Sequence, residues 1–291
     1  PLDPVLLQKR CALQQSLWME PDSLALVISQ SGETADTLAA LRIAREHGVP
    51  VLGLCNVVGS SIARESSAVI YTQAGPEISV ASTKAMCSQM LMLALVALYW
   101  GGRQGIMDAA ARARQIALLE SLPSQLDAAL PAMHEKARQL ARAYAQARNF
   151  FYLGRGHCYP LALEGALKLK ELSYIHAEGY AAGEMKHGPI SLIEKNMLVV
   201  GVLTQPDLYE KMVSNLVEAK SRGAYIMGLT TYGNYSIEDT ANFTVYVPKT
   251  DPHFATSLSV VPLQLLAYYV SCAKGLDVDK PRNLAKSVTV E

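Results

Sequence analysis

The sequence contains an internal repeat, in which apolar segments recur at an offset of about 174 residues. The matching pairs are Leu24–Ile28 with Leu198–Val202, Gly48–Val51 with Gly223–Ile226, Ala68–Tyr71 with Phe243–Tyr246, and an apolar helical pattern ending at Gly101 with one ending at Gly275. Two copies of one structural unit, joined by a helical linker, explain such a constant offset better than chance does.

Within each copy, apolar runs of strand length alternate with helical patterns. This alternation predicts an α/β fold with parallel sheets that are covered by helices on both faces. We expect a first domain at residues 1–125, which includes the linker helix, and a second domain at residues 126–291. The second copy opens with a strand, a turn and a helix at 150–175, and their counterparts would lie before residue 1. The repeat therefore predicts a first domain that is truncated at its N-terminus.

The apolar patterns also give the individual elements. We expect strands at 24–29, 51–55, 68–72, 150–153, 197–203, 224–229 and 243–247. We expect helices at 4–18, 33–47, 81–100, 159–175, 207–222 and 256–274, with two more between 105 and 147. Gly101 and Gly102 are predicted to end the helix at 81–100, and a glycine-rich loop is predicted after residue 175.

The turn Ser29–Thr37 joins the predicted strand 24–29 to the predicted helix 33–47. The first turn of a helix has unpaired N–H groups and a partial positive charge, and it therefore attracts anions. The hydroxyls of Ser29, Ser31 and Thr34 add donors, and Gly32 lets the backbone approach an anion closely. An ordinary helix cap is the alternative, but one cap needs only one hydroxyl. Because the sequence has neither a Walker lysine nor a Gly-x-Gly-x-x-Gly motif, we interpret the turn as a site for a small phosphorylated metabolite.

Composition excludes several other classes of protein. Lys and Arg together number 26, as do Asp and Glu, and this balance argues against broad binding to nucleic acid or to anionic membranes. The longest apolar run, 90–100, is shorter than the roughly 20 residues that span a bilayer. Residues 1–8 lack the pattern of a signal peptide. Five scattered cysteines suggest neither a zinc site nor a disulfide framework, and we expect mostly buried free thiols in a cytoplasmic protein.

A second cluster of charged residues lies in the second copy. Glu164, Lys168 and Glu171 are spaced i, i+4 and i+7, so that they share one face of the predicted helix 159–175. A surface salt-bridge ladder, worth about 0.2–0.5 kcal/mol per pair, is the simpler interpretation. However, the segment that follows is rich in His, Glu and Gly and contains His187 before a Gly-Pro pair. Such loops beside a charged helix face are typical of acid–base catalysis, although a single histidine is more often structural.

The C-terminal segment 277–291 has neither a helical nor a strand period, and it contains Lys286. A frayed tail is one interpretation. In the other, Lys286 lies against a sugar phosphate and forms a Schiff base with an open-chain ketose, because desolvation favours the neutral, nucleophilic amine.

Six motifs together resemble the isomerase half of the glutamine–fructose-6-phosphate aminotransferase family, also called glucosamine-6-phosphate synthases. They are Ser29–Thr37, Val80–Lys84, Leu153–Gly156, Ala162–Glu171, Glu184–Pro189 and Pro281–Glu291. The resemblance extends over residues 24–291 and implies two tandem flavodoxin-like sugar isomerase (SIS) domains. It also implies that fructose 6-phosphate is converted to glucosamine 6-phosphate, in hexosamine biosynthesis, without a cofactor or a metal.

The resemblance assigns roles to individual positions. It implies that Glu171 shuttles a proton between C1 and C2 with help from Lys168, that Lys286 forms the Schiff base, and that His187 helps to open the sugar ring from the partner subunit of a homodimer. The substrate-binding positions are Ser29, Gln30, Ser31 and Thr34 for the phosphate, and Val80, Ser82 and Ala285 for the sugar. Neither nucleic acid nor a membrane is implied as a partner.

The sequence departs from the family in two respects. We find no glutaminase domain with its N-terminal cysteine, and we therefore expect no glutamine-dependent synthesis by this chain. We also find no Cys-Gly-Thr-Ser turn at the start of the first SIS domain and no resemblance within residues 1–22. The alternative hypothesis is a catalytically inactive SIS fragment that binds a phosphosugar.

Overall fold

The computed structural model describes residues 22–286, which form two compact units. Of the described residues, 22–93 together with 285–286 belong to unit 1, and Ala94–Leu284 form unit 2. The boundary predicted between residues 125 and 126 stays a prediction, and it falls within helix α4 (Ala109–Tyr144) of unit 2. The helix predicted at 4–18 lies outside the described residues.

Unit 1 contains a three-stranded parallel sheet in the order β1 (Ala25–Ser29), β2 (Val51–Cys55) and β3 (Ala68–Tyr71). Helices α1 (Ala35–Glu46) and α2 (Ser61–Glu65) follow β1 and β2 in the chain. One face of the sheet forms a core with these helices, made of Val27, Leu41, Ala44, Val49, Val51, Cys55 and Ile62. Alternate residues of a strand point to opposite faces, and Leu26 and Ile28 of β1 are accordingly exposed on the other face.

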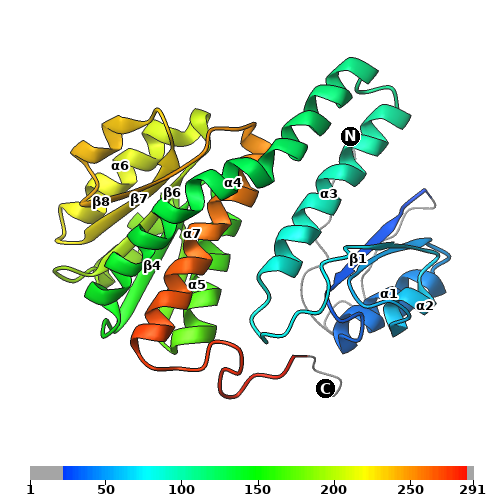
Figure 1. Ribbon diagram of the computed structural model, residues 1–291, viewed down its shortest axis with the longest axis horizontal. Helices are drawn as coiled ribbons and strands as arrows, with labels where there is room; N and C mark the ends of the chain where they lie inside the picture. Colours follow the sequence, from blue (N-terminus) through cyan, green and yellow to red (C-terminus); the bar gives the residue numbers. More distant parts are fainter. Residues whose placement is uncertain (1–21, 287–291) are drawn as a thin grey trace. The chain divides into compact units, whose positions relative to one another are not determined.

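Unit 2 contains a five-stranded parallel sheet in the order β5-β4-β6-β7-β8. The strands are β4 (Asn149–Gly154), β5 (His176–Ala181), β6 (Leu198–Leu203), β7 (Tyr225–Thr231) and β8 (Phe243–Val247). Helices α4, α5 (Cys158–Ser173) and α7 (Pro252–Ala273) cover one face of the sheet, and α6 (Tyr209–Lys220) covers the other (Figure 1). Every residue of β6 is buried, as expected of a central strand between two helical layers.

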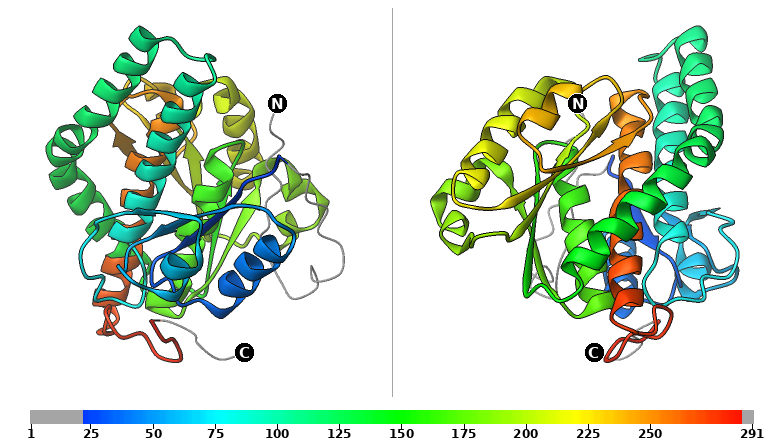
Figure 2. Two further views of the ribbon diagram at one scale, coloured as in Figure 1. Left: turned by 90° about the vertical axis from the view of Figure 1, so that its right-hand side faces the viewer. Right: turned by 60° about the vertical axis from the view of Figure 1, so that its left-hand side comes forward.

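The two sheets confirm the predicted repeat and the fold class. In unit 1 the order β1-β2-β3 reproduces the order β6-β7-β8 of unit 2. Counted within unit 2, the strand order is 2-1-3-4-5, which is the flavodoxin-like order. Figure 2 shows the layers of unit 2 from two further directions. Of the described residues, none pairs with the outer edge of β1, whereas its counterpart β6 is paired on both sides.

The predicted helices between 105 and 147 are in fact one helix, α4, which contains Pro123 and Pro131. Both prolines are exposed, and so is Asp127, so that the carbonyl group that Pro131 leaves without a helical partner can be hydrated. The predicted helix end at Gly101 is also wrong, because α3 (Lys84–Arg103) continues through both glycines. A Cβ on Gly102 would lie 2.0 Å from the Arg112 side chain, so that this glycine permits a close approach.

Two short elements were not predicted. The segment after residue 175 was expected to be a loop, but His176–Ala181 forms the edge strand β5. Its Gly179 packs against the backbone of α5, where a Cβ would lie 2.9 Å from Leu163. Helix α2 lies where only a turn was expected. Four 3-10 segments complete the described part of the chain, namely η2 (Ala182–His187), η3 (Pro189–Leu192), η4 (Pro206–Leu208) and η5 (Tyr235–Asp239).

Helices α3 and α7 are long and apolar enough to cross a membrane by length and composition alone. The apolar window of α7 is 61% buried, as in the core helix of a folded domain, whereas that of α3 is only 11% buried.

Among the described cysteines, Cys55 and Cys158 are buried, Cys87 is half-buried and Cys272 is exposed, so that only some of them fit the predicted buried thiols.

Candidate active site

The turn after β1 brings the predicted phosphate-binding residues together at the carboxyl edge of the unit 1 sheet. Ser29 Oγ lies 3.1 Å from Thr34 Oγ1 and accepts a hydrogen bond of 3.0 Å from the Gly32 N–H. Ser31 Oγ accepts a hydrogen bond of 3.2 Å from the Glu33 N–H. Gly32 has φ of +69°, a left-handed conformation that glycine adopts without strain. These contacts fold the turn tightly around its own hydroxyl groups.

None of these hydroxyls caps helix α1. Thr34 is the N-cap residue, but its side chain makes no capping hydrogen bond. The first N–H groups of a helix lack partners within the helix, so that the start of α1 retains donors for an anion. The ordinary-cap interpretation of the Ser31–Thr34 pair is therefore not supported.

The acidic residue of this turn points elsewhere. Glu33 Oε1 accepts a hydrogen bond of 2.8 Å from the Ser61 N–H at the start of α2. Hydrogen bonding to Ser61 lowers the pKa of the Glu33 carboxyl group. The Glu33 carboxylate thus binds the start of α2 and is not directed at the N-terminus of α1.

The segment between β3 and α3 carries the predicted sugar-lining residues Val80 and Ser82. Glu77 Oε2 accepts a hydrogen bond of 2.8 Å from the Ala85 N–H, in the first turn of α3. The Lys286 ammonium group donates a hydrogen bond to the carbonyl oxygen of Ser79. The structure therefore brings Lys286 to the residue before Val80, within unit 1, while Ala285 beside it is exposed.

The predicted ionic cluster of unit 2 is present on α5. Lys168 Nζ lies 2.6 Å from Glu171 Oε2 and 3.5 Å from Glu164 Oε1. The Lys168 side chain is 5% exposed, and those of Glu164 and Glu171 are 12% and 22% exposed. Burial raises the pKa of the Glu164 carboxyl group, although the charge of Lys168 opposes this rise. A buried lysine between two carboxylates differs from the surface salt-bridge ladder of the simpler interpretation.

His187 is the last residue of η2, and it is exposed. The segment before it is held in unit 2 by the buried side chain of Met185 and by an ion pair of 2.8 Å between Lys186 and Glu218.

The tail before Lys286 is held in unit 2 by Tyr174, because the Arg282 guanidinium lies 4.2 Å from the centroid of the Tyr174 ring. The Arg282 N–H donates a hydrogen bond of 2.7 Å to the Tyr174 hydroxyl, and this contact argues against a frayed tail.

The turn of unit 2 that corresponds to Ser29–Thr34 follows β6, at residues 204–207. Its Gln205 Oε1 accepts a hydrogen bond of 2.9 Å from the His157 N–H, at the N-cap of α5. Gln205 Nε2 in turn lies 3.3 Å from the Asp207 carboxylate. The Gln205 side chain thus fills this turn, and the Asp207 carboxylate lies beside it.

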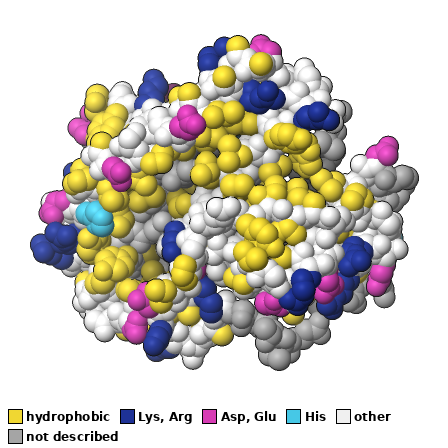
Figure 3. All heavy atoms as spheres, turned by 45° about the vertical axis from the view of Figure 1, so that its right-hand side comes forward, with side chains coloured by type: hydrophobic (Ala, Val, Ile, Leu, Met, Phe, Trp, Pro, Cys, Tyr) yellow, Lys and Arg dark blue, Asp and Glu magenta, His cyan; other side chains and the backbone are white. Residues whose placement is uncertain are grey.

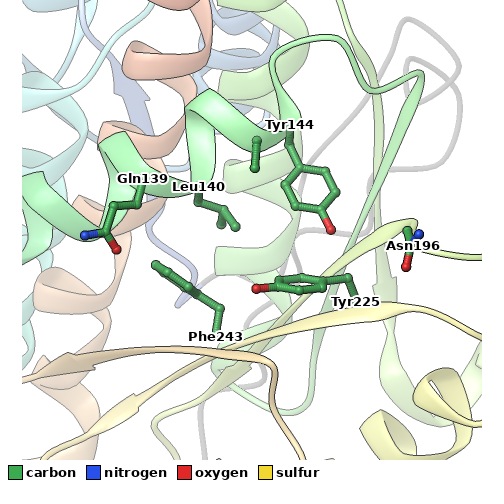
Figure 4. Close-up of a pocket in the computed structure, with 7 residues that line it drawn as sticks. Gln139, Leu140, Tyr144, Asn196, Tyr225 and Phe243 are labelled. Atoms are coloured by element: carbon green, nitrogen blue, oxygen red, sulfur yellow. The ribbon is translucent and has the colours of Figure 1, made fainter.

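A hollow of about 440 Å³ lies at the opposite edge of the unit 2 sheet (Figure 4). Its walls include Tyr144 of α4, Asn196, and the first residues of two strands, Tyr225 and Phe243. Ligands of parallel α/β sheets bind at the carboxyl ends of the strands, so that this hollow at the amino ends is not the predicted phosphate site.

Two polar residues of unit 1 with contacts near the predicted site residues were not singled out in the sequence. Glu77 lies directly after the Gly75-Pro76 break, seven residues before α3 begins, so that no sequence signal for a helix cap identifies it. Asn56 lies directly after β2, where parallel strands place functional side chains. Among residues 22–286, His, Cys, Asp and Glu side chains form no group of three or more that could hold a metal ion.

Comparisons with known proteins identify the family of the chain. The family model of the SIS domain matches residues 12–99 and 143–274. The first match begins at residue 12, so that the expectation of no resemblance within residues 1–22 is wrong for residues 12–22. The chain is 49% identical over 268 residues to glutamine–fructose-6-phosphate aminotransferase [isomerizing] of Caldanaerobacter subterraneus, covering 92% of this chain and 44% of that protein. It is 50% identical over 273 residues to the enzyme of the same name from Clostridium tetani, covering 94% and 45%.

A solved structure shows the same likeness. The C-terminal domain of glucosamine-fructose-6-phosphate aminotransferase from Francisella tularensis superimposes with a TM-score of 0.86 at 37% identity. The match covers 93% of this chain and 77% of that one. The chain thus spans less than half the length of the curated relatives above, and most of the length of an isolated C-terminal domain.

Proposed function

The chain belongs to the SIS domain family, and we propose that it is the isomerising part of a glutamine–fructose-6-phosphate aminotransferase, which acts on fructose 6-phosphate. The observation that carries the proposal is the turn Ser29–Thr34, where three hydroxyl residues gather at a helix start that has no side-chain cap. A dianionic phosphate group suits these donors.

The proposed reaction divides the work among four residues. The Lys286 amine adds to the C2 carbonyl of the open-chain ketose and water leaves, and ammonia then displaces the lysine. Glu171 removes a proton from C1 and returns it to C2. Lys168, at 2.6 Å from Glu171, orients this carboxylate, and His187 assists ring opening from a partner subunit. Free ammonia can supply the nitrogen when residues 1–291 are assayed alone.

Titration of the chain with fructose 6-phosphate, glucosamine 6-phosphate and unphosphorylated fructose tests the proposal. We expect the two phosphates to bind and fructose to bind far more weakly, because the turn supplies most of the affinity. Assays with fructose 6-phosphate and ammonia should then form glucosamine 6-phosphate. Binding without turnover would instead support an inactive phosphosugar-binding fragment, and the absence of binding would contradict the proposal.

Replacing Gly32 with Ala should weaken fructose 6-phosphate binding by about tenfold or more. A non-glycine residue in the left-handed region costs roughly 1–2 kcal/mol, and a Cβ at Gly32 would lie 2.0 Å from Ser60 Oγ. The turn must therefore distort. Isothermal titration calorimetry measures the change in affinity.

The matched control is Gly48→Ala. Gly48 has φ of +74°, but a Cβ there would meet nothing within 4 Å, and it follows the far end of α1. This variant should lose stability and keep its affinity. Equal losses of affinity in the two variants would show that the effect of Gly32→Ala is not local to the turn.

A homodimer in the cytoplasm is part of the proposal. Helix α3 supports a protein partner, because Leu91, Tyr99 and Trp100 are 38%, 62% and 37% exposed. Hydrophobic side chains are plainly visible at the surface in Figure 3.

If His187 acts across the dimer, mixing Glu171→Gln with His187→Ala chains should restore part of the turnover, since hybrid dimers contain one intact site. Activity that stays at the level of the separate variants would place His187 in its own subunit's site.

A further inference from the structure

Asn56 joins two parts of the candidate site in unit 1. It follows β2 directly, and its backbone N–H donates a hydrogen bond of 3.2 Å to the carbonyl oxygen of Gln30, in the phosphate turn. Its side chain faces the loop after β3. Oδ1 accepts hydrogen bonds of 2.9 Å from the Thr72 hydroxyl and 2.9 Å from the Ala74 N–H, and Nδ2 donates one of 2.8 Å to the Gly75 carbonyl oxygen.

The loop that Asn56 holds has an unfavourable backbone. Gln73 has φ of +51° and Gly75 has φ of +69°, so that two of three successive residues are left-handed. A non-glycine residue in this region is uncommon and persists where its surroundings fix it. The three side-chain hydrogen bonds of Asn56 are made to the residues on either side of Gln73 and to Gly75 itself. They fix the conformation of this loop.

The loop continues into the part of the site proposed to hold the sugar. Glu77 caps α3 through the Ala85 N–H, and the Ser79 carbonyl accepts the hydrogen bond from Lys286. Val80 and Ser82 lie between these contacts in the chain. A shift of residues 72–75 would therefore move the sugar-binding segment and the Lys286 contact relative to the phosphate turn.

We propose that Asn56 is a positioning residue, which sets the spacing between the phosphate turn and the sugar-binding segment and thereby selects a phosphosugar of the correct length. This proposal rests on the proposed function, because it takes Ser29–Thr34 to be the phosphate site. Mutation of the side chain leaves the backbone bond to Gln30 in place, so that the turn itself should survive.

Two probes separate positioning from general structural damage. Inorganic phosphate reports on the turn alone, and fructose 6-phosphate reports on the turn and the sugar-binding segment together. In the full chain, Asn56→Ala should weaken fructose 6-phosphate binding by about tenfold or more, since three hydrogen bonds are lost, and leave phosphate affinity unchanged. Thr72→Val removes only one of these bonds, so that its effect should be smaller, and it serves if Asn56→Ala does not fold.

Asn234→Ala is the matched control. Asn234 follows β7, the counterpart of β2 in the repeat, and its Nδ2 donates to the hydroxyls of Thr230 and Thr231 at 3.0 and 3.1 Å. This variant should bind both probes as the parent does. If Asn56→Ala, or Thr72→Val in its place, weakens both probes equally or neither, the positioning role is wrong. If the parent chain does not bind fructose 6-phosphate, the proposed function itself fails, and the two failures are thereby distinguished.

Discussion

Replacing Glu171 with Gln should lower turnover by about 10²–10⁴-fold, because glutamine cannot accept the proton that moves between C1 and C2. Glutamine nearly preserves the shape of the side chain and can still accept a hydrogen bond from Lys168 Nζ, which lies 2.6 Å from Glu171 Oε2. Affinity for fructose 6-phosphate should change little, since the phosphate turn is elsewhere in the chain. The measurement is steady-state turnover with ammonia, combined with calorimetric titration.

Glu164→Gln is the matched control for this prediction. Glu164 lies on the same helix and also faces Lys168, but at 3.5 Å and with its side chain only 12% exposed. We expect it to support the buried ammonium group and not to reach the substrate. If Glu164→Gln loses turnover while Glu171→Gln works at the parent rate, we have assigned the base to the wrong carboxylate.

Replacing Lys286 with Met should abolish covalent trapping of the ketose and lower turnover on the order of 10³-fold or more. Borohydride reduces a Schiff base to a stable secondary amine, so that the parent chain treated with fructose 6-phosphate and borohydride should carry a phosphosugar adduct on Lys286. Mass spectrometry of peptides locates the adduct. The Met variant should carry none, while its affinity for inorganic phosphate should stay the same.

Lys280→Met is the control for nonspecific lysine chemistry, since Lys280 lies in the same tail and is exposed. It should leave both the adduct and the turnover intact. An adduct on another lysine in the parent chain, with none on Lys286, would contradict the proposed nucleophile.

Much of the fold could be predicted because its signals are local. The strands of unit 2 that lie between two helical layers are continuous apolar runs, and Leu198–Leu203 is recognisable from sequence alone. The repeat then predicts that both units use one topology, which the common strand order confirms. The hydroxyl turn was predictable for the same reason, since its residues are neighbours in the chain.

The errors arose where tertiary contacts override local preference. Two helices were expected between residues 105 and 147, but α4 continues through the exposed Pro123 and Pro131. Gly179 suggested a loop, but it lets β5 lie close to the α5 backbone. The side-chain contacts of Asn56 could not be predicted, because its partners lie 16–19 residues away in the sequence.

A crystal structure of the chain with bound fructose 6-phosphate tests the central claim most directly. We predict that the phosphate group lies in the turn Ser29–Thr34, where it contacts the hydroxyls of Ser29, Ser31 and Thr34 and the first N–H groups of α1. The corresponding turn of unit 2 should be empty of phosphate, because Gln205 fills it and Asp207 would repel an anion. A phosphosugar bound at residues 204–207, with none at the first turn, would contradict the account.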